Sequence, residues 1–140
     1  MKGIYPVIFT QTNDGILIEV PDMEILTEGK NMTDAIEMAR DAIGLKGICI
    51  EDAGSPLPLS SEMKEIDVSK GVFAKEGESF VSLVDIDFGV YRRKVDNKMV
   101  RRNVTLPNWL NLAAEKEGIN VSKVLQDALI EKFGMKPKMY

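Results

Sequence analysis

Histidine is absent from the 140-residue sequence, and cysteine and tryptophan each occur once. Without histidine, the chain lacks the commonest general base and the commonest metal ligand of proteins. The single cysteine, Cys49, cannot form an internal disulfide, and since it lies between two isoleucines we expect it to be buried. No Gly-rich phosphate loop or cysteine cluster occurs. We therefore expect no catalytic residue, no metal site and no cofactor.

Long apolar segments are also missing. No run approaches the roughly 20 residues of a membrane-spanning helix. The N-terminus lacks the basic segment and apolar core of a secretory signal. With 44% hydrophobic and 29% charged residues, the composition is typical of a soluble globular protein. We expect a cytoplasmic protein with no membrane partner.

The net charge of −4 is the sum of two halves of opposite sign. Residues 1–91 contain 7 Lys and Arg against 17 Asp and Glu, a balance of −10, whereas residues 92–140 contain 11 against 5, a balance of +6. This asymmetry favours two modules with different partners, although a chance distribution of surface charge would produce it too. A basic module suits a polyanion, and an acidic module suits a basic protein.

Strand and turn signals predict a β-β-β-α-β order in the acidic half. The predicted strands are residues 5–10, 16–20, 25–28 and 80–90. Asn31 is a good N-cap for the helix, whose apolar face Gly44 and Gly47 interrupt. Asp85 and Asp87 share one face of the last strand, which we expect to face solvent rather than a metal ion.

The basic half reads as one strand and two helices. Residues 99–106 form the strand, and a first helix, capped by Asn108, begins at Trp109 and ends at Gly118. Asn120 caps a second helix with an apolar stripe. The stripe consists of Val121, Val124, Leu125, Ala128, Leu129 and Phe133. The fold class is α+β, with domains at residues 1–91 and 99–140 and a charged linker at 92–98.

A strand and two helices cannot bury a stable core alone, so we expect the basic half to form a homodimer. Pairing of two strands would make a ribbon that the DNA major groove admits. Arg101, Asn103 and Thr105 would face outwards on that ribbon, and these residue types read base edges. Lys123 and the free N–H groups after Asn120 would hold a phosphate. The alternative is an exposed polar strand face in an ordinary dimer.

Three segments of the basic half resemble a ribbon-helix-helix DNA-binding domain. They are residues 100–107 (VRRNVTLP), Trp109-Leu110 and residues 117–122 (EGINVS). The resemblance implies that Arg101, Asn103 and Thr105 read bases. It also implies that Asn120, Val121 and Ser122 clamp a phosphate of double-stranded DNA.

Four segments of the acidic half, at residues 5–9 (YPVIF), 14–15, 20–22 (VPD) and 33–35 with Ala39, are similar to the N-terminal domain of HicB antitoxins. A fifth segment, residues 84–88 (VDIDF) with 91–94 (YRRK), resembles the longer branch of that family, which carries a ribbon-helix-helix domain. The turn at Met23-Glu24-Ile25 departs from the family pattern.

This resemblance implies a partial ribonuclease H fold that masks a HicA-type toxin, a ribonuclease that cleaves messenger RNA. It also implies that the second domain represses transcription of the toxin-antitoxin operon by binding its operator. It leaves open which residues contact the toxin and whether two dimers form a higher oligomer.

Two other functions stay open at this point. One is a stand-alone ribbon-helix-helix transcriptional regulator whose first domain senses a ligand. The other is a ribonuclease H-like enzyme, which the absence of a carboxylate in residues 5–10 disfavours.

Overall fold

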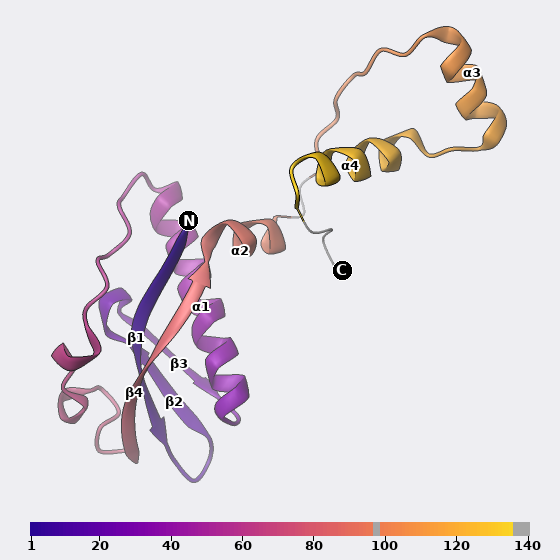
Figure 1. Ribbon diagram of the computed structural model, residues 1–140. Helices are drawn as coiled ribbons and strands as arrows, with labels where there is room; N and C mark the ends of the chain where they lie inside the picture. Colours follow the sequence, from indigo (N-terminus) through magenta and orange to yellow (C-terminus); the bar gives the residue numbers. More distant parts are fainter. Residues whose placement is uncertain (97–98, 136–140) are drawn as a thin grey trace. The chain divides into compact units, whose positions relative to one another are not determined.

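The computed structural model describes residues 1–96 and 99–135, and it divides into two compact units, Met1–Asp96 and Asn97–Tyr140 (Figure 1). Together they contain a four-stranded antiparallel sheet and four α-helices, which confirms the α+β class.

The sheet of the first unit has the strand order β3-β2-β1-β4. Its strands are β1 (Lys2–Gln11), β2 (Ile16–Val20), β3 (Ile25–Gly29) and β4 (Glu78–Asp87). The predicted second strand is confirmed. The first is longer than predicted because β4 pairs with it along its whole length, from Lys2 opposite Asp87 to Gln11 opposite Glu78. Long-range pairing of this kind extends a strand beyond its local apolar signal.

Helix α1 (Met32–Asp52) covers one face of the sheet, where the core lies (Figure 1). It begins where the sequence predicts, because the Asn31 side-chain oxygen accepts a hydrogen bond from the Asp34 N–H at 2.9 Å. The fully buried core side chains at this interface are Val7, Phe9, Ile18, Val20, Ala35, Ala39 and Ile43. Every second residue of β1 and β2 thus packs against one stripe of α1. This is the pattern expected from a repeat of 2 residues in a strand and 3.6 residues in a helix.

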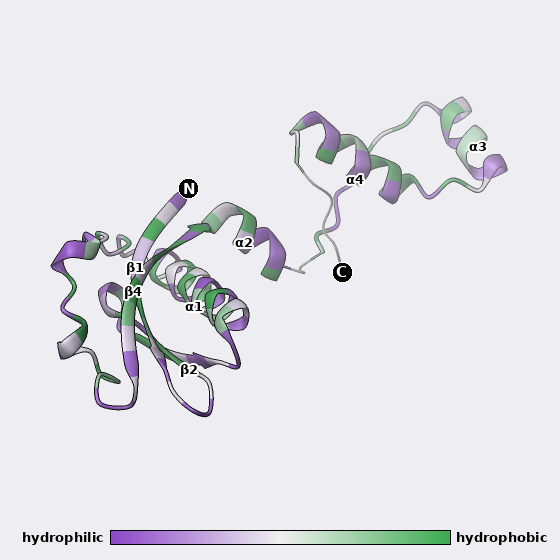
Figure 2. Ribbon diagram, turned by 60° about the horizontal axis from the view of Figure 1, so that its bottom comes forward, coloured by the Kyte–Doolittle hydropathy of each residue, from purple (hydrophilic) through white to green (hydrophobic). Residues whose placement is uncertain are grey.

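Residues 53–77 cross the other side of the sheet from α1, as both ribbon views show (Figures 1 and 2). The segment contains two short helices, η2 (Met63–Glu65) and η3 (Val68–Lys70), and a third, η1 (Pro21–Met23), joins β2 to β3. The Asp22 carboxylate accepts hydrogen bonds from the Ser61 N–H at 2.8 Å and hydroxyl at 2.6 Å, and Glu19 accepts one from the Val72 N–H at 2.9 Å. These hydrogen bonds hold the segment to η1 and β2, and on the second face of β1 the residues Pro6, Ile8 and Thr10 are buried.

Helix α2 (Phe88–Val95) replaces the end of the predicted fourth strand and the start of the predicted linker. The strand stops at Asp87 because its carboxylate accepts a hydrogen bond from the Val90 N–H at 3.2 Å, which starts a helix. Phe88 and Tyr91 are then buried against α1. Arg92 donates a hydrogen bond to the Asp52 carboxylate at 2.9 Å. Residues 92–95 therefore belong to the first unit.

The second unit contains α3 (Asn108–Glu117) and α4 (Val121–Lys132). Gly118, at φ 65°, ends α3 as predicted. Asn108 is not the N-cap, since the helix begins at this residue and Pro107 precedes it. The predicted strand over residues 99–106 has no regular secondary structure in this single chain. Residues 97–98 of the predicted linker and 136–140 of the predicted second domain lie outside the described residues.

Candidate functional site

The three predicted base-reading residues lie together on an extended segment. Arg101, Asn103 and Thr105 are all exposed, and the segment from Met99 to Pro107 is neither helix nor strand. A strand exists only through hydrogen bonds to a neighbouring strand, and the described residues of one chain supply no such neighbour here. The segment is therefore available for pairing with another chain.

The predicted phosphate clamp is the first turn of α4. The Asn120 side-chain oxygen accepts a hydrogen bond from the Lys123 N–H at 3.1 Å, and the first bond of the helical ladder runs from the Val124 N–H to the Asn120 carbonyl at 3.1 Å. The N–H groups of Val121 and Ser122 precede that ladder and point out of the helix end. Such groups favour an anion.

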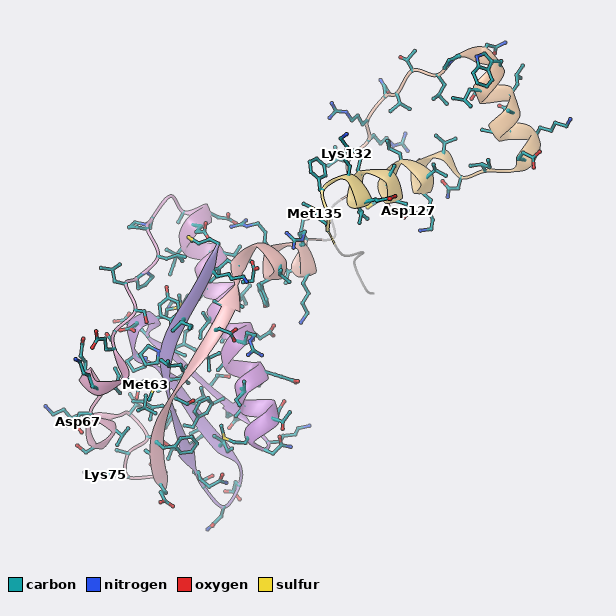
Figure 3. All side chains as sticks on the ribbon, in the orientation of Figure 1. Met63, Asp67, Lys75, Asp127, Lys132 and Met135 are labelled. Atoms are coloured by element: carbon teal, nitrogen blue, oxygen red, sulfur yellow. The ribbon has the colours of Figure 1, made fainter. Side chains whose placement is uncertain are left out.

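The Lys123 ammonium lies 3.4 Å from the Asp127 carboxylate, one turn along α4, where Figure 3 labels Asp127. Both side chains are exposed, and exposed pairs of this kind contribute only about 0–1 kcal/mol. A phosphate could therefore compete with Asp127 for the ammonium. This pair was not predicted from the sequence, although its i, i+4 spacing was a usable signal.

The predicted apolar stripe of α4 is exposed in the single chain. Val124 is 56% exposed, Leu129 46% and Phe133 68%. Trp109 of α3 is 71% exposed, and none of the described residues 99–135 is buried. Figure 2 shows green and purple residues side by side on both helices. The described residues 99–135 therefore present apolar side chains without a buried core of their own.

Comparison with solved structures finds the same fold in toxin-antitoxin proteins. A chain of a toxin-antitoxin complex from Streptococcus pneumoniae shares 21% identity and a TM-score of 0.61, over 94% of this chain and 99% of that chain. The structure described as antitoxin HicB3 shares 25% identity and a TM-score of 0.50, over 93% and 97% of the two chains. The chain has the fold of HicB-type antitoxin structures.

A chain of the HicA3 and HicB3 toxin-antitoxin complex matches a smaller part, 61% of this chain and 99% of that chain, at 23% identity and a TM-score of 0.50. Comparison with protein-family models and with curated proteins finds no match. At identities this low, the likeness to the two complexes establishes the fold and not the activity. The HicB-like fold predicted from residues 5–9 and 84–88 agrees with these neighbours.

The two carboxylates of β4 each have a hydrogen-bond partner within the protein. Asp85 accepts a hydrogen bond from an Arg40 NH2 group at 3.0 Å, and Asp87 caps α2. The hydrogen bond from Val90 is the main cause that lowers the pKa of Asp87. Among the described residues, no group of three or more Asp, Glu or Cys side chains could hold a metal ion. The contact of Arg40 with Asp85 was not predicted, because no local sequence signal links two residues that are 45 positions apart.

The first unit presents an acidic groove of about 810 Å³ at the β1–β2 turn and the start of α1. Its charged lining residues are Asp14, Glu28, Lys30, Asp34 and Glu76. The acidity of this unit was predicted from its composition. The groove was not, because it joins residues from four separate segments.

Cys49 is exposed on α1, so the prediction that it is buried was wrong. It follows the buried Ile48 by one residue, and a step of about 100° around the helix turns it away from the sheet. No described helix is long and apolar enough to cross a membrane.

Proposed function

We propose that this protein is an antitoxin that neutralises a HicA-type ribonuclease toxin and represses its own operon. The observation that carries the proposal is the fold, which is shared over 94% of this chain with a chain of a toxin-antitoxin complex. The likeness to the HicB3 antitoxin, at 25% identity over nearly the whole chain, supports the same role. In this proposal the protein has no catalytic activity of its own.

The first unit would bind the toxin. A ribonuclease must attract the phosphates of its RNA, so its active-site surface should be basic. Residues 1–91 have a balance of −10, and the acidic groove concentrates part of that charge in one concave surface. An acidic protein surface would compete with RNA for the toxin's active site. Electrostatic attraction should mainly raise the association rate, which should therefore fall with added salt.

The second unit would bind operator DNA as a homodimer of the ribbon-helix-helix type. Pairing of residues 99–106 with the same segment of a second chain would give both segments the backbone partners that they lack. It would also bring the apolar stripes of α4 together. Arg101, Asn103 and Thr105 would read bases in the major groove, while Asn120, Val121, Ser122 and Lys123 would bind phosphate.

The two activities can be separated in one experiment. The protein and the product of the neighbouring reading frame are co-expressed, and growth and operator binding are measured. Arg101→Ala and Asn103→Ala should each weaken operator binding by about 1–3 kcal/mol and relax its base preference, while growth rescue persists. Lys123→Ala is the matched control, because losing a phosphate contact should weaken all DNA sequences about equally.

Unchanged base preference in the Arg101/Asn103 double variant would exclude the proposed reading face. Continued growth arrest by the neighbouring gene product, with this protein folded and in excess, would exclude the antitoxin function.

A further inference from the structure

One hydrogen bond shows which backbone N–H and C=O groups of β4 point away from the sheet. The strand lies at the end of the sheet, beside β1 alone. The Arg40 Nε donates a hydrogen bond to the Asp85 carbonyl oxygen at 3.0 Å, so this carbonyl points away from β1. In an antiparallel pair, the N–H and C=O of one residue point to the same side, and successive residues alternate. Those of Ser79, Val81 and Leu83 therefore point outwards as well.

Pro6 supports this alternation independently. It lies opposite Leu83 in the ladder between β1 and β4 and has no N–H to donate. Because the groups of Leu83 point outwards, the missing N–H of Pro6 costs the ladder no hydrogen bond. Pairing of β1 with β2 starts only at Ile8, so no bond is lost on that side either. The bonds to β1 are made by Phe80, Ser82 and Val84.

The outward groups of residues 79–83 have no hydrogen-bond partner among the described residues. Arg40 occupies the edge at Asp85, and the segment 53–77 bonds instead to side chains of β1, β2 and η1. Phe80 and Leu83, on opposite faces of β4, are 44% and 48% exposed. Proteins normally protect such edges with proline or charged side chains, and residues 79–83 contain neither. An open edge with apolar flanks is suited to accept another strand.

We propose that this edge receives an extended segment of the basic toxin as a fifth strand of the sheet. The proposal rests on the antitoxin function proposed above. Glu76 and Glu78 lie at one end of the open edge, and Glu76 also lines the acidic groove. At the other end, the Asp85 carboxylate is already paired with Arg40. A basic segment would therefore meet opposite charge at the Glu76 and Glu78 end and along the groove beside it.

The test is a proline at an outward position. In Val81→Pro, the lost N–H makes no bond to β1, and proline is tolerated on edge strands in this orientation, so the sheet should persist. Toxin binding by the full-length protein should weaken by roughly tenfold or more, because the ring blocks pairing and removes a donor. Val81→Ala keeps the N–H and should bind within about threefold of the unsubstituted protein. Operator binding should not change in either variant.

Amide hydrogen exchange of the unsubstituted protein provides a second test that needs no variant. In the free protein, Phe80 and Ser82 should be protected, whereas Ser79, Val81 and Leu83 should exchange rapidly. Saturation with the toxin should protect the second set.

Rapid exchange of these amides in the complex, or equal toxin affinity of Val81→Pro and Val81→Ala, would overturn the edge proposal and leave the antitoxin function intact. A lower oligomeric state of Val81→Pro with unchanged toxin affinity would assign the edge to a second copy instead. Failure of the unsubstituted protein to bind the neighbouring gene product would overturn both proposals.

Discussion

At the scale of single residues, two glycines of α1 allow α2 to pack closely against it. Gly44 and Gly47 interrupt the apolar face of α1 and would be expected to weaken the helix. A Cβ at Gly44 would lie 2.7 Å from the Tyr91 ring, and a Cβ at Gly47 would clash with the Phe88 ring. The two glycines therefore make room for the aromatic side chains of α2. Burial, with help from Asp41, raises the pKa of Tyr91 to about 12.

We expect Gly47→Ala to destabilise the protein by about 1–3 kcal/mol, although alanine favours a helix by about 1 kcal/mol over glycine. The reason is the collision of the new methyl group with Phe88. Urea unfolding of the full-length protein measures the change. Leu45→Ala is the control, because Leu45 is exposed on the same helix and should change stability by about 0.5 kcal/mol or less. A more stable Gly47→Ala variant would contradict this account of the packing.

At the scale of elements, α4 carries its apolar residues on one stripe that the single chain leaves exposed. A stripe with i, i+3, i+4 spacing is the usual pattern of a helix that packs against another surface. Leu125 lies within it and is 37% exposed. The stripe therefore predicts that dimerisation and folding of the second unit are one event.

Leu125→Asp should abolish both the dimer and the folded second unit, because it would bury a charge without a partner. Analytical ultracentrifugation measures the oligomeric state, and circular dichroism measures helix content. Gln126→Asp adds the same charge one residue away, outside the stripe, and should remain dimeric. Should Leu125→Asp sediment as a folded dimer, the proposed interface would have to lie elsewhere.

At the scale of the whole molecule, the two units correspond to the two proposed activities. The boundary follows Asp96, because α2 packs on α1 through Phe88 and Tyr91. The salt bridge between Arg92 and Asp52 also lies within the first unit. A fragment that ends at residue 91 would lose this bridge and the last turn of α2.

We expect a fragment of residues 1–96 to fold alone and to neutralise the toxin without binding operator DNA. Its sheet, α1 and α2 form a continuous core that needs no residue of the second unit. Co-expression with the neighbouring toxin gene measures growth rescue, and a gel-shift assay measures DNA binding. The fragment of residues 1–91 should be less stable to urea. A folded 1–96 fragment that failed to rescue growth would show that inhibition requires the second unit.

The sequence alone predicted the elements whose signals are local. The Asn31 and Asn120 caps, the end of α3 at Gly118 and the stripe of α4 depend on neighbours within a few residues. The end of β4 was predicted wrongly, because the apolar alternation through Phe88 favoured a strand to residue 90, whereas the Asp87 carboxylate caps α2. The opposite net charges of the two halves could likewise be predicted from the sequence without a structure.

Only the tertiary structure decided which residues meet across long distances. The pairing of β4 with β1, the contact of Arg40 with Asp85 and the packing of α2 on Gly44 and Gly47 join segments about 40 to 85 residues apart. Such contacts depend on topology rather than on local propensity, so a period or a cap cannot predict them. The open edge of β4 belongs to this class, because the direction of each N–H is set by the strand beside it.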